Sequence, residues 1–334
     1  MKTLRIITLA AAAALMLAGC AKDPSSKNGD VNDNWWYTGN LGPKGVKTIV
    51  DNNLTENYDK DGRLISSKST WGESTITYNS DGLPVKVVEK GLTEGTVTGE
   101  SVTTYEYKNK GKFCPVPMGP GRIFHLFENG LLPGLSKVTY GTGDDANVME
   151  YKFSGNTLTV STSGTYSHPD DDGKMVEEPY EDIVWEYSGA YPLKYADDKE
   201  FLGPFTFQEN GMFDTYVEGF FDWNHKGFVT THRTRTISKE FKDKMLPEKE
   251  VDLWYNYPNE DPYDTETITY TYNEHGDVVK ELVTHTAPLS ENTETTYEYE
   301  YDDHGNWIKC SGSVKVVDGE VYNTWTETRT IEYY

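Results

Sequence analysis

Polar and large apolar residues alternate along most of the chain with a period of two, which is typical of β-strands rather than helices. The clearest stretch is "YEYEY" (297–301). Such stretches often end at an aromatic residue followed four positions later by glycine. Seven copies share this pattern: "YDKDG" (58–62), "YNSDG" (78–82), "YKNKG" (107–111), "FQENG" (207–211), "WNHKG" (223–227), "YNEHG" (272–276) and "YDDHG" (301–305). Apolar residues resume after the glycine, so each copy predicts a strand, a turn and a strand.

The polar residues of the repeat explain why the chain would turn there. A type I turn favours Asp or Asn at its first position, where five copies carry Asp59, Asn79, Asn224, Asn273 and Asp302. The last position needs a left-handed backbone, which glycine adopts without steric cost. We therefore expect structural turn glycines at Gly62, Gly82, Gly111, Gly211, Gly227, Gly276 and Gly305. The aromatic residue before each turn is expected to pack against its counterpart in the next hairpin.

Two segments interrupt the alternation. Residues 113–135 are apolar and broken by prolines, and their middle predicts one short helix. Residues 238–246 predict another, because Ser238 is a plausible N-cap and Pro247 follows directly. The polar segments 167–179 and 257–264 predict exposed loops.

Two of the stretches carry a family resemblance. "YDKDGRLISS" and "YEYEYDDHGNWIK" resemble the YD repeats of the RHS family, and also repeats in exported lipoproteins of Bacteroidetes-type bacteria, a family of unknown function. The resemblance implies a curved antiparallel β array and implies no catalytic residues. With the two helical segments, the expected fold class is all-β: a curved antiparallel sheet of repeated β-hairpins with one or two short helices.

The first residues have the composition of an export signal. Lys2 and Arg5 flank the start of an apolar run that is shorter than the roughly 20 residues of a membrane span and ends in "LAGC" (17–20). A Cys after Leu-Ala-Gly resembles the lipobox of bacterial lipoproteins, in which that thiol receives a diacylglycerol and the chain is cut before it. Cys20 is then the lipidation site. An ordinary secretory signal with an incidental Cys is the alternative.

This interpretation sets the expected domain organisation. Residues 1–19 form a lipoprotein signal peptide, the polar residues 20–34 a flexible tether, and residues 35–334 a single repeat-built β domain. The expected location is the cell envelope, at the outer membrane of a Gram-negative bacterium.

Charge and cysteine content narrow the partners. The net charge is −23, and loss of Lys2 and Arg5 with the signal makes it more negative, so nucleic acid and anionic lipid head groups are poor partners. Aromatic residues make up 13% of the chain, which argues against disorder. Apart from Cys20 there are two cysteines, Cys114 and Cys310, which could form a disulfide or remain as two free buried thiols.

The most suggestive polar cluster is Asp302, Asp303 and His304, which could ligate a divalent metal. His275 occupies the place of His304 in its own copy, but other copies carry Asp, Lys or Asn there. We interpret this position as solvent-facing turn chemistry and expect neither a metal site nor a cofactor. "DKDG" and "NSDG" resemble the opening of a calcium loop but lack the acid needed at its twelfth position.

Catalytic motifs are not recognisable. The sequence contains no Gly-x-Ser-x-Gly elbow, no His-Glu-x-x-His and no glycine-rich phosphate loop. Its 54 acidic residues show no local pattern that selects a pair for hydrolysis. Cys114 and His125 could form a catalytic thiol–imidazole pair. The alternative, which we favour, is that Cys114 is a buried structural cysteine. No catalytic residue is assigned.

Aromatic residues give the best binding hypothesis, because exposed rings can stack on sugars. The alternative for each ring is a place in the core of the sheet. The candidates are Trp35, Trp36, Tyr37, Trp71, Trp185, Trp223, Trp254 and Trp325.

The sequence thus predicts a lipid-anchored, non-enzymatic envelope protein that acts as an interaction scaffold. Its expected partners are the membrane, through the lipid, and a glycan or another envelope protein. A glycan-binding accessory lipoprotein and a carboxylate-dependent hydrolase remain the alternatives.

Overall fold

The all-β prediction is confirmed. The computed structural model is almost entirely strand in the residues that it describes, with one short 3-10 turn, η3 (Gly143–Asp145). No helix among these residues is long and apolar enough to cross a membrane. The described residues are 45–51, 54–93, 95–116, 131–169, 174–196, 200–203, 205–207, 213–221, 229–240, 246–256, 259, 261–288 and 290–334.

The strands fall into two compact units, of which the first contains Ile65–Leu193. Successive strands of this unit pair antiparallel from β3 to β9, and β12 then pairs with β9. β10 and β11 form a separate hairpin. The strands are β3 (Leu64–Ser69), β4 (Gly72–Tyr78), β5 (Pro84–Thr93), β6 (Thr96–Pro115), β7 (Leu131–Tyr140), β8 (Asn147–Ser154), β9 (Thr157–Thr162), β10 (Thr165–Pro169), β11 (Met175–Pro179) and β12 (Ile183–Ser188).

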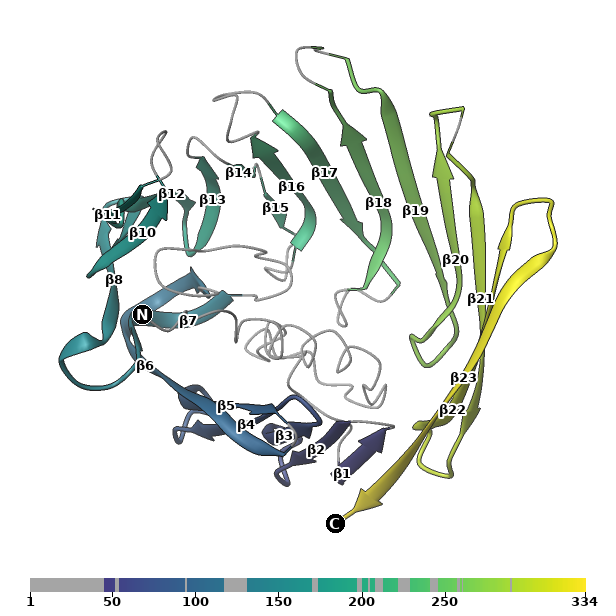
Figure 1. Ribbon diagram of the computed structural model, residues 1–334, viewed down its shortest axis with the longest axis horizontal. Coiled ribbons are helices and arrows are strands. Elements are labelled where there is room, and N and C mark those ends of the chain that lie inside the picture. Colours follow the sequence, from purple (N-terminus) through teal and green to yellow (C-terminus); the bar gives the residue numbers. More distant parts are fainter. Residues whose placement is uncertain are drawn as a thin grey trace. The chain divides into compact units, whose positions relative to one another are not determined.

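The second unit contains residues 45–64 and Lys194–Tyr334. Successive strands from β16 to β23 pair antiparallel, and β1 then pairs with β23, so the start of the described chain adds to its end (Figure 1). The strands are β1 (Val46–Asp51), β2 (Leu54–Tyr58), β14 (Glu200–Leu202), β15 (Thr206–Phe207), β16 (Phe213–Phe221), β17 (Val229–Ile237), β18 (Pro247–Trp254), β19 (Asp264–Tyr272), β20 (Val278–His285), β21 (Thr293–Tyr301), β22 (Trp307–Val316) and β23 (Val321–Tyr333); β13 (Tyr191–Ala196) spans the boundary between the units.

The alternating pattern determines which side chains enter the core. In β12, "IVWEYS", Ile183, Trp185 and Tyr187 are buried, whereas the residues between them are exposed. Trp185 is fully buried and lies in the first unit together with Leu135, Val138, Met149 and Leu158, which are also fully buried. The hydrophobic effect therefore fixes the face of each strand by its period of two.

Four described copies of the repeat form the same turn. In the copies whose turns start at Asp59, Asn79, Asn273 and Asp302, the backbone N–H of this residue donates to the carbonyl of the residue four positions later, and its own carbonyl accepts the glycine N–H. Its side-chain Oδ1 accepts two further backbone N–H groups. The glycines have positive φ: 82° at Gly62, 76° at Gly82, 83° at Gly276 and 80° at Gly305.

The copy at Gly111 does not separate two strands, contrary to the prediction. Gly111 also has a positive φ, 73°, but β6 continues through it to Pro115. The register with β7 shifts between Asn109, opposite Gly134, and Phe113, opposite Pro133. The extra residues form a bulge, in which Lys112 donates to the carbonyl of Gly189 and the N–H of Phe113 to that of Ala190. Partners outside the hairpin therefore keep the chain extended.

Other expectations fall partly outside the described residues. The loop predicted at 167–179 is wrong in part, since residues on its two sides pair as β10 and β11. The middles of both predicted helices, Gly211 and Gly227 lie outside the described ranges, as do the signal peptide, the tether and Cys20. These remain predictions.

Candidate functional site

The Asp302, Asp303 and His304 cluster lies in the β21–β22 turn, and its Asp302 and His304 contact Tyr333 on β23. The Tyr333 hydroxyl donates to Asp302, and the Asn306 side chain donates to the same hydroxyl at 2.8 Å. The His304 ring stacks on the Tyr333 ring with 4.0 Å between centroids. Burial alone would raise the pKa of Asp302, but the Tyr333 hydroxyl and the N–H groups of Asn306 and His304 outweigh it and lower this pKa.

The β19–β20 turn repeats this arrangement with two residue types exchanged. Tyr301 donates to Asp277 at 2.7 Å, and the Asn273 amide donates to Tyr301 at 2.6 Å. The His275 ring stacks on Tyr301 at 4.1 Å. The carboxylate stands after the glycine in this copy and before it in the other, but each tyrosine hydroxyl meets one carboxylate and one amide.

The aromatic residues therefore join each hairpin to the turn before it. The sequence predicts that each ring packs against its aromatic counterpart, whereas Tyr301 and Tyr333 each stack on a histidine of the preceding turn. Tyr299 and Tyr107 also donate to backbone carbonyls just after the preceding turns, at Val278 and Pro84. Turn residues thus hold neighbouring hairpins in register.

We expect Tyr301→Phe to lower the free energy of unfolding by about 1–1.5 kcal/mol, because the half-buried hydroxyl bonds both Asp277 and Asn273. Urea denaturation of this variant, of Asp277→Asn and of the double variant measures the coupling. Tyr322→Phe is the control, because Tyr322 is 63% exposed on β23. Strictly additive losses would contradict a hydrogen-bonded link between the hairpins.

The structure supports no shared role for Asp302, Asp303 and His304. Asp302 is engaged through both carboxylate oxygens and His304 through its ring, whereas Asp303 is exposed. No group of three His, Cys, Asp or Glu side chains within the described residues could hold a metal ion.

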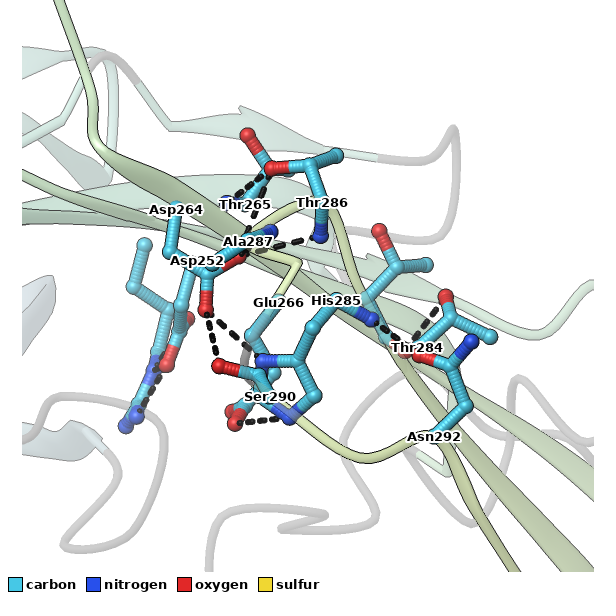
Figure 2. Close-up of polar contacts among 12 residues, drawn as sticks. Asp252, Asp264, Thr265, Glu266, Thr284, His285, Thr286, Ala287, Ser290 and Asn292 are labelled. Atoms are coloured by element: carbon cyan, nitrogen blue, oxygen red, sulfur yellow. Dashed lines mark hydrogen bonds and ion pairs between the residues drawn. The ribbon is translucent and has the colours of Figure 1, made fainter. Parts of the chain in front are cut away.

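A different polar cluster, which sequence reasoning missed, crosses four strands of the second unit (Figure 2). Arg233 lies opposite Asp252, Asp252 opposite Glu266, and Glu266 opposite His285. Arg233 binds Asp252 through two nitrogens, Nε at 2.7 Å from Oδ1 and Nη2 at 2.6 Å from Oδ2. Asp252 is only 2% exposed, so this bidentate pair neutralises a buried charge.

Asp264, at the start of β19, joins this row to the loop after β20. Its Oδ1 accepts the backbone N–H groups of Thr286 at 3.0 Å and Ala287 at 2.8 Å, and its Oδ2 contacts His285 Nδ1 at 2.8 Å. Burial opposes ionisation, but these bonds outweigh it and lower the pKa of Asp264 to about 2. The prediction of an exposed loop at 257–264 is wrong for Asp264. This residue is only 5% exposed, because its carboxylate is turned towards these donors and away from solvent.

His285 lies between two carboxylates. Its Nδ1 contacts Asp264, and its Nε2 lies 3.5 Å from Glu266 Oε2. Burial raises the pKa of Glu266, against the opposing charges of His285 and Arg233. The arrangement places an imidazole between two carboxylates, a combination of residue types that general acid–base sites use. Asp264, however, is committed to holding the loop.

Cys114 and Cys310 are free and buried. Burial raises the pKa of Cys114 to about 12, and this thiol donates to the Leu135 carbonyl at 3.3 Å. A neutral thiol of this kind is a poor nucleophile. His125, its possible catalytic partner, lies outside the described residues.

The candidate sugar-binding tryptophans differ in exposure. Trp71 is 72% exposed at the turn between β3 and β4, whereas Trp185 is fully buried. Trp254 and Trp325 are half-buried, and the Trp325 ring lies over Gly312. Trp35, Trp36, Tyr37 and Trp223 fall in parts of the chain that the structure leaves undescribed.

Comparisons with known proteins give limited information. No protein-family model and no curated protein matches the chain. A porin-like protein from Bacteroides uniformis aligns over 86% of this chain and 98% of its own, with 14% identity and a TM-score of 0.34. One from Bacteroides vulgatus covers the same shares at 12% identity and a TM-score of 0.26.

A third similar structure is the TcdB2-TccC3-Cdc42 complex. The match covers 80% of this chain but only 13% of that one, at 12% identity and a TM-score of 0.21. Similarities this low carry no argument about function.

Proposed function

We propose that the protein is a non-enzymatic interaction scaffold of the cell envelope, anchored to the outer membrane by a lipid on Cys20. The contacts of Asp302 and His304 with Tyr333 are the observation that carries the scaffold role. Asp302 and His304 are the residues of the repeat with the best chemistry for metal binding, and these contacts use them to join neighbouring hairpins instead. An array held together in this way leaves large side chains such as Trp71, Tyr263 and Tyr322 exposed for contact with a partner.

The anchor rests on the sequence "LAGC" (17–20). We expect the full-length protein to partition into the detergent phase of Triton X-114, and Cys20→Ser to move it to the aqueous phase, because acyl chains supply most of the membrane affinity. Cys310→Ser, which alters a buried thiol, is the matched control and should stay with the detergent. A Cys20→Ser protein that still partitions into detergent refutes lipid anchoring.

Glycan binding is the second candidate, and the exposure of Trp71 favours it. An exposed indole can stack on the apolar face of a sugar ring. A glycan array comparing the native protein with Trp71→Ala tests it, and uniformly blank binding by the native protein counts against it.

A further inference from the structure

The outer edge of β23 is only partly covered by its neighbours. β22 pairs with one side of β23 from Val321 to Thr328. On the other side, β1 pairs with β23 from Arg329 to Tyr333 (Figure 1). No strand within the described ranges pairs with the outer side of Val321–Thr328. This open edge, residues 321–328, belongs to the long hairpin at the C-terminal end of the chain.

The open edge has the composition of a strand that can accept another strand. Its sequence is "VYNTWTET", with β-branched and aromatic residues at most positions and no lysine or proline. Every second residue of an antiparallel edge strand points its N–H and C=O groups outward. Natural proteins usually block such edges with lysine, proline or a bulge. Here the register with β22 shifts once, between Val321 and Asn323 at the hairpin end, and residues 323–328 pair regularly. Here Val321 and Tyr322 are 52% and 63% exposed.

We propose that this open edge binds an extended segment of another protein, which adds to β23 as a further strand. The proposal deepens the scaffold function and rests on it. Backbone groups supply the pairing, and side chains of alternate residues supply the choice of partner. Trp325 and Glu327 lie on one face of β23 because they are two residues apart. The segment that fits has a large apolar residue beside Trp325 and a lysine or arginine beside Glu327.

Charge decides between a foreign segment and a second copy. The chain carries a net charge of −23, so two copies repel each other as they approach. A neutral or basic segment meets no such repulsion. A basic segment can also place a lysine or arginine opposite Glu327 across the two strands. The occupant is therefore a basic, extended segment of a different protein.

Hydrogen–deuterium exchange of the full-length protein tests the proposal. The probe is a synthetic peptide as long as the open edge, in which threonine alternates with valine, tyrosine and lysine. A matched peptide carries N-methyl groups on every second residue, which remove backbone donors and keep the side-chain charges. We expect the first peptide to slow exchange of the outward-facing amides of residues 321–328 about tenfold, and the methylated peptide to bind about tenfold more weakly.

Two charge reversals locate the binding. Glu327→Lys should weaken binding of the unmethylated peptide about tenfold. Glu298→Lys changes the charge equally, but Glu298 lies on β21, which β22 separates from β23, so this variant should leave binding unchanged. Equal binding of the two peptides overturns the proposal. So does slow exchange of the outward-facing amides of residues 321–328 in the free protein, either as a monomer, whose own chain then covers the edge, or as a dimer, whose second copy does.

The outcomes separate this proposal from the lipid anchor. A protein that binds the peptide but partitions into the aqueous phase retains the open edge and loses the anchor. A lipid-anchored protein that binds neither peptide retains the anchor and loses the open edge as a binding site.

Discussion

Replacing Asp264 by Ala is expected to lower the free energy of unfolding by about 3–5 kcal/mol, the largest effect of any single polar substitution considered. The carboxylate is 5% exposed and accepts the N–H groups of Thr286 and Ala287 as well as His285. Alanine leaves these donors without an acceptor in a place that water reaches poorly. Urea denaturation at neutral pH measures the loss.

The control for Asp264→Ala is a residue of the segment that joins β18 to β19. Asp261→Ala removes an exposed carboxylate just before β19 and should change stability by less than about 0.5 kcal/mol. A loss of that small size for Asp264→Ala as well would contradict the role of Asp264 in holding the loop after β20.

The contribution of Asp264 should also depend on pH. Its pKa in the folded protein, about 2, lies below the ordinary value of 3.8. The ionised group therefore stabilises the fold above pH 3.8, and this stabilisation is lost as the pH falls towards 2. Asp264→Asn, which cannot ionise, should lose less stability than the native protein over that range. An identical acid dependence of the two proteins would contradict the lowered pKa.

Replacing Gly305 by Val is expected to cost about 2–3 kcal/mol, because a β-branched residue is strained at a φ of +80°. Crowding contributes little, since the nearest atoms to an added Cβ are those of the His275 ring at 3.8 and 3.9 Å, which is ordinary contact. The backbone of the turn is the source of the cost. Urea denaturation again gives the measurement.

Gly305→Asn separates backbone strain from the loss of glycine itself. Asparagine tolerates the left-handed region better than other residues with a Cβ, so this variant should lose about 1 kcal/mol or less. Equal losses for Val and Asn would show that the φ of Gly305 is not what limits substitution there.

The repeat predicts the turns because everything that makes them is local. Asp or Asn at the first position and glycine at the fourth lie within one short segment, and the bonds of the Asn273 and Asp302 turns run between residues no more than four apart. Strand direction follows from these turns, and strand faces follow from the alternation. The all-β fold was therefore predictable from sequence.

The remaining features depend on residues that are distant in the sequence. The bulge at Gly111 is bonded to Gly189 and Ala190, and nothing near Gly111 indicates those partners. Asp264 and His285 are 21 residues apart and meet only through the register of β19 and β20. An acidic residue at the start of a strand could have marked Asp264 as a candidate. Its partners could not have been identified without knowing how β19 and β20 pair.

The link between hairpins had a clearer signal. Tyr333 contacts a residue 31 positions earlier and Tyr301 one 28 positions earlier, so each contact spans about one interval of the repeat. A tyrosine at the end of one strand and a histidine in the preceding turn recur together in these two copies. Matching each of these tyrosines with the histidine of the preceding turn would have predicted the two ring stacks.

The measurement that most directly tests the structural role of the repeat is the NMR spectrum of the His304 imidazole in the native protein and in Tyr333→Leu. Stacking at 4.0 Å predicts ring-proton resonances shifted upfield by the Tyr333 ring in the native protein, and a return towards the values of an unstacked imidazole in the variant. Resonances of an unstacked imidazole in the native protein would contradict it.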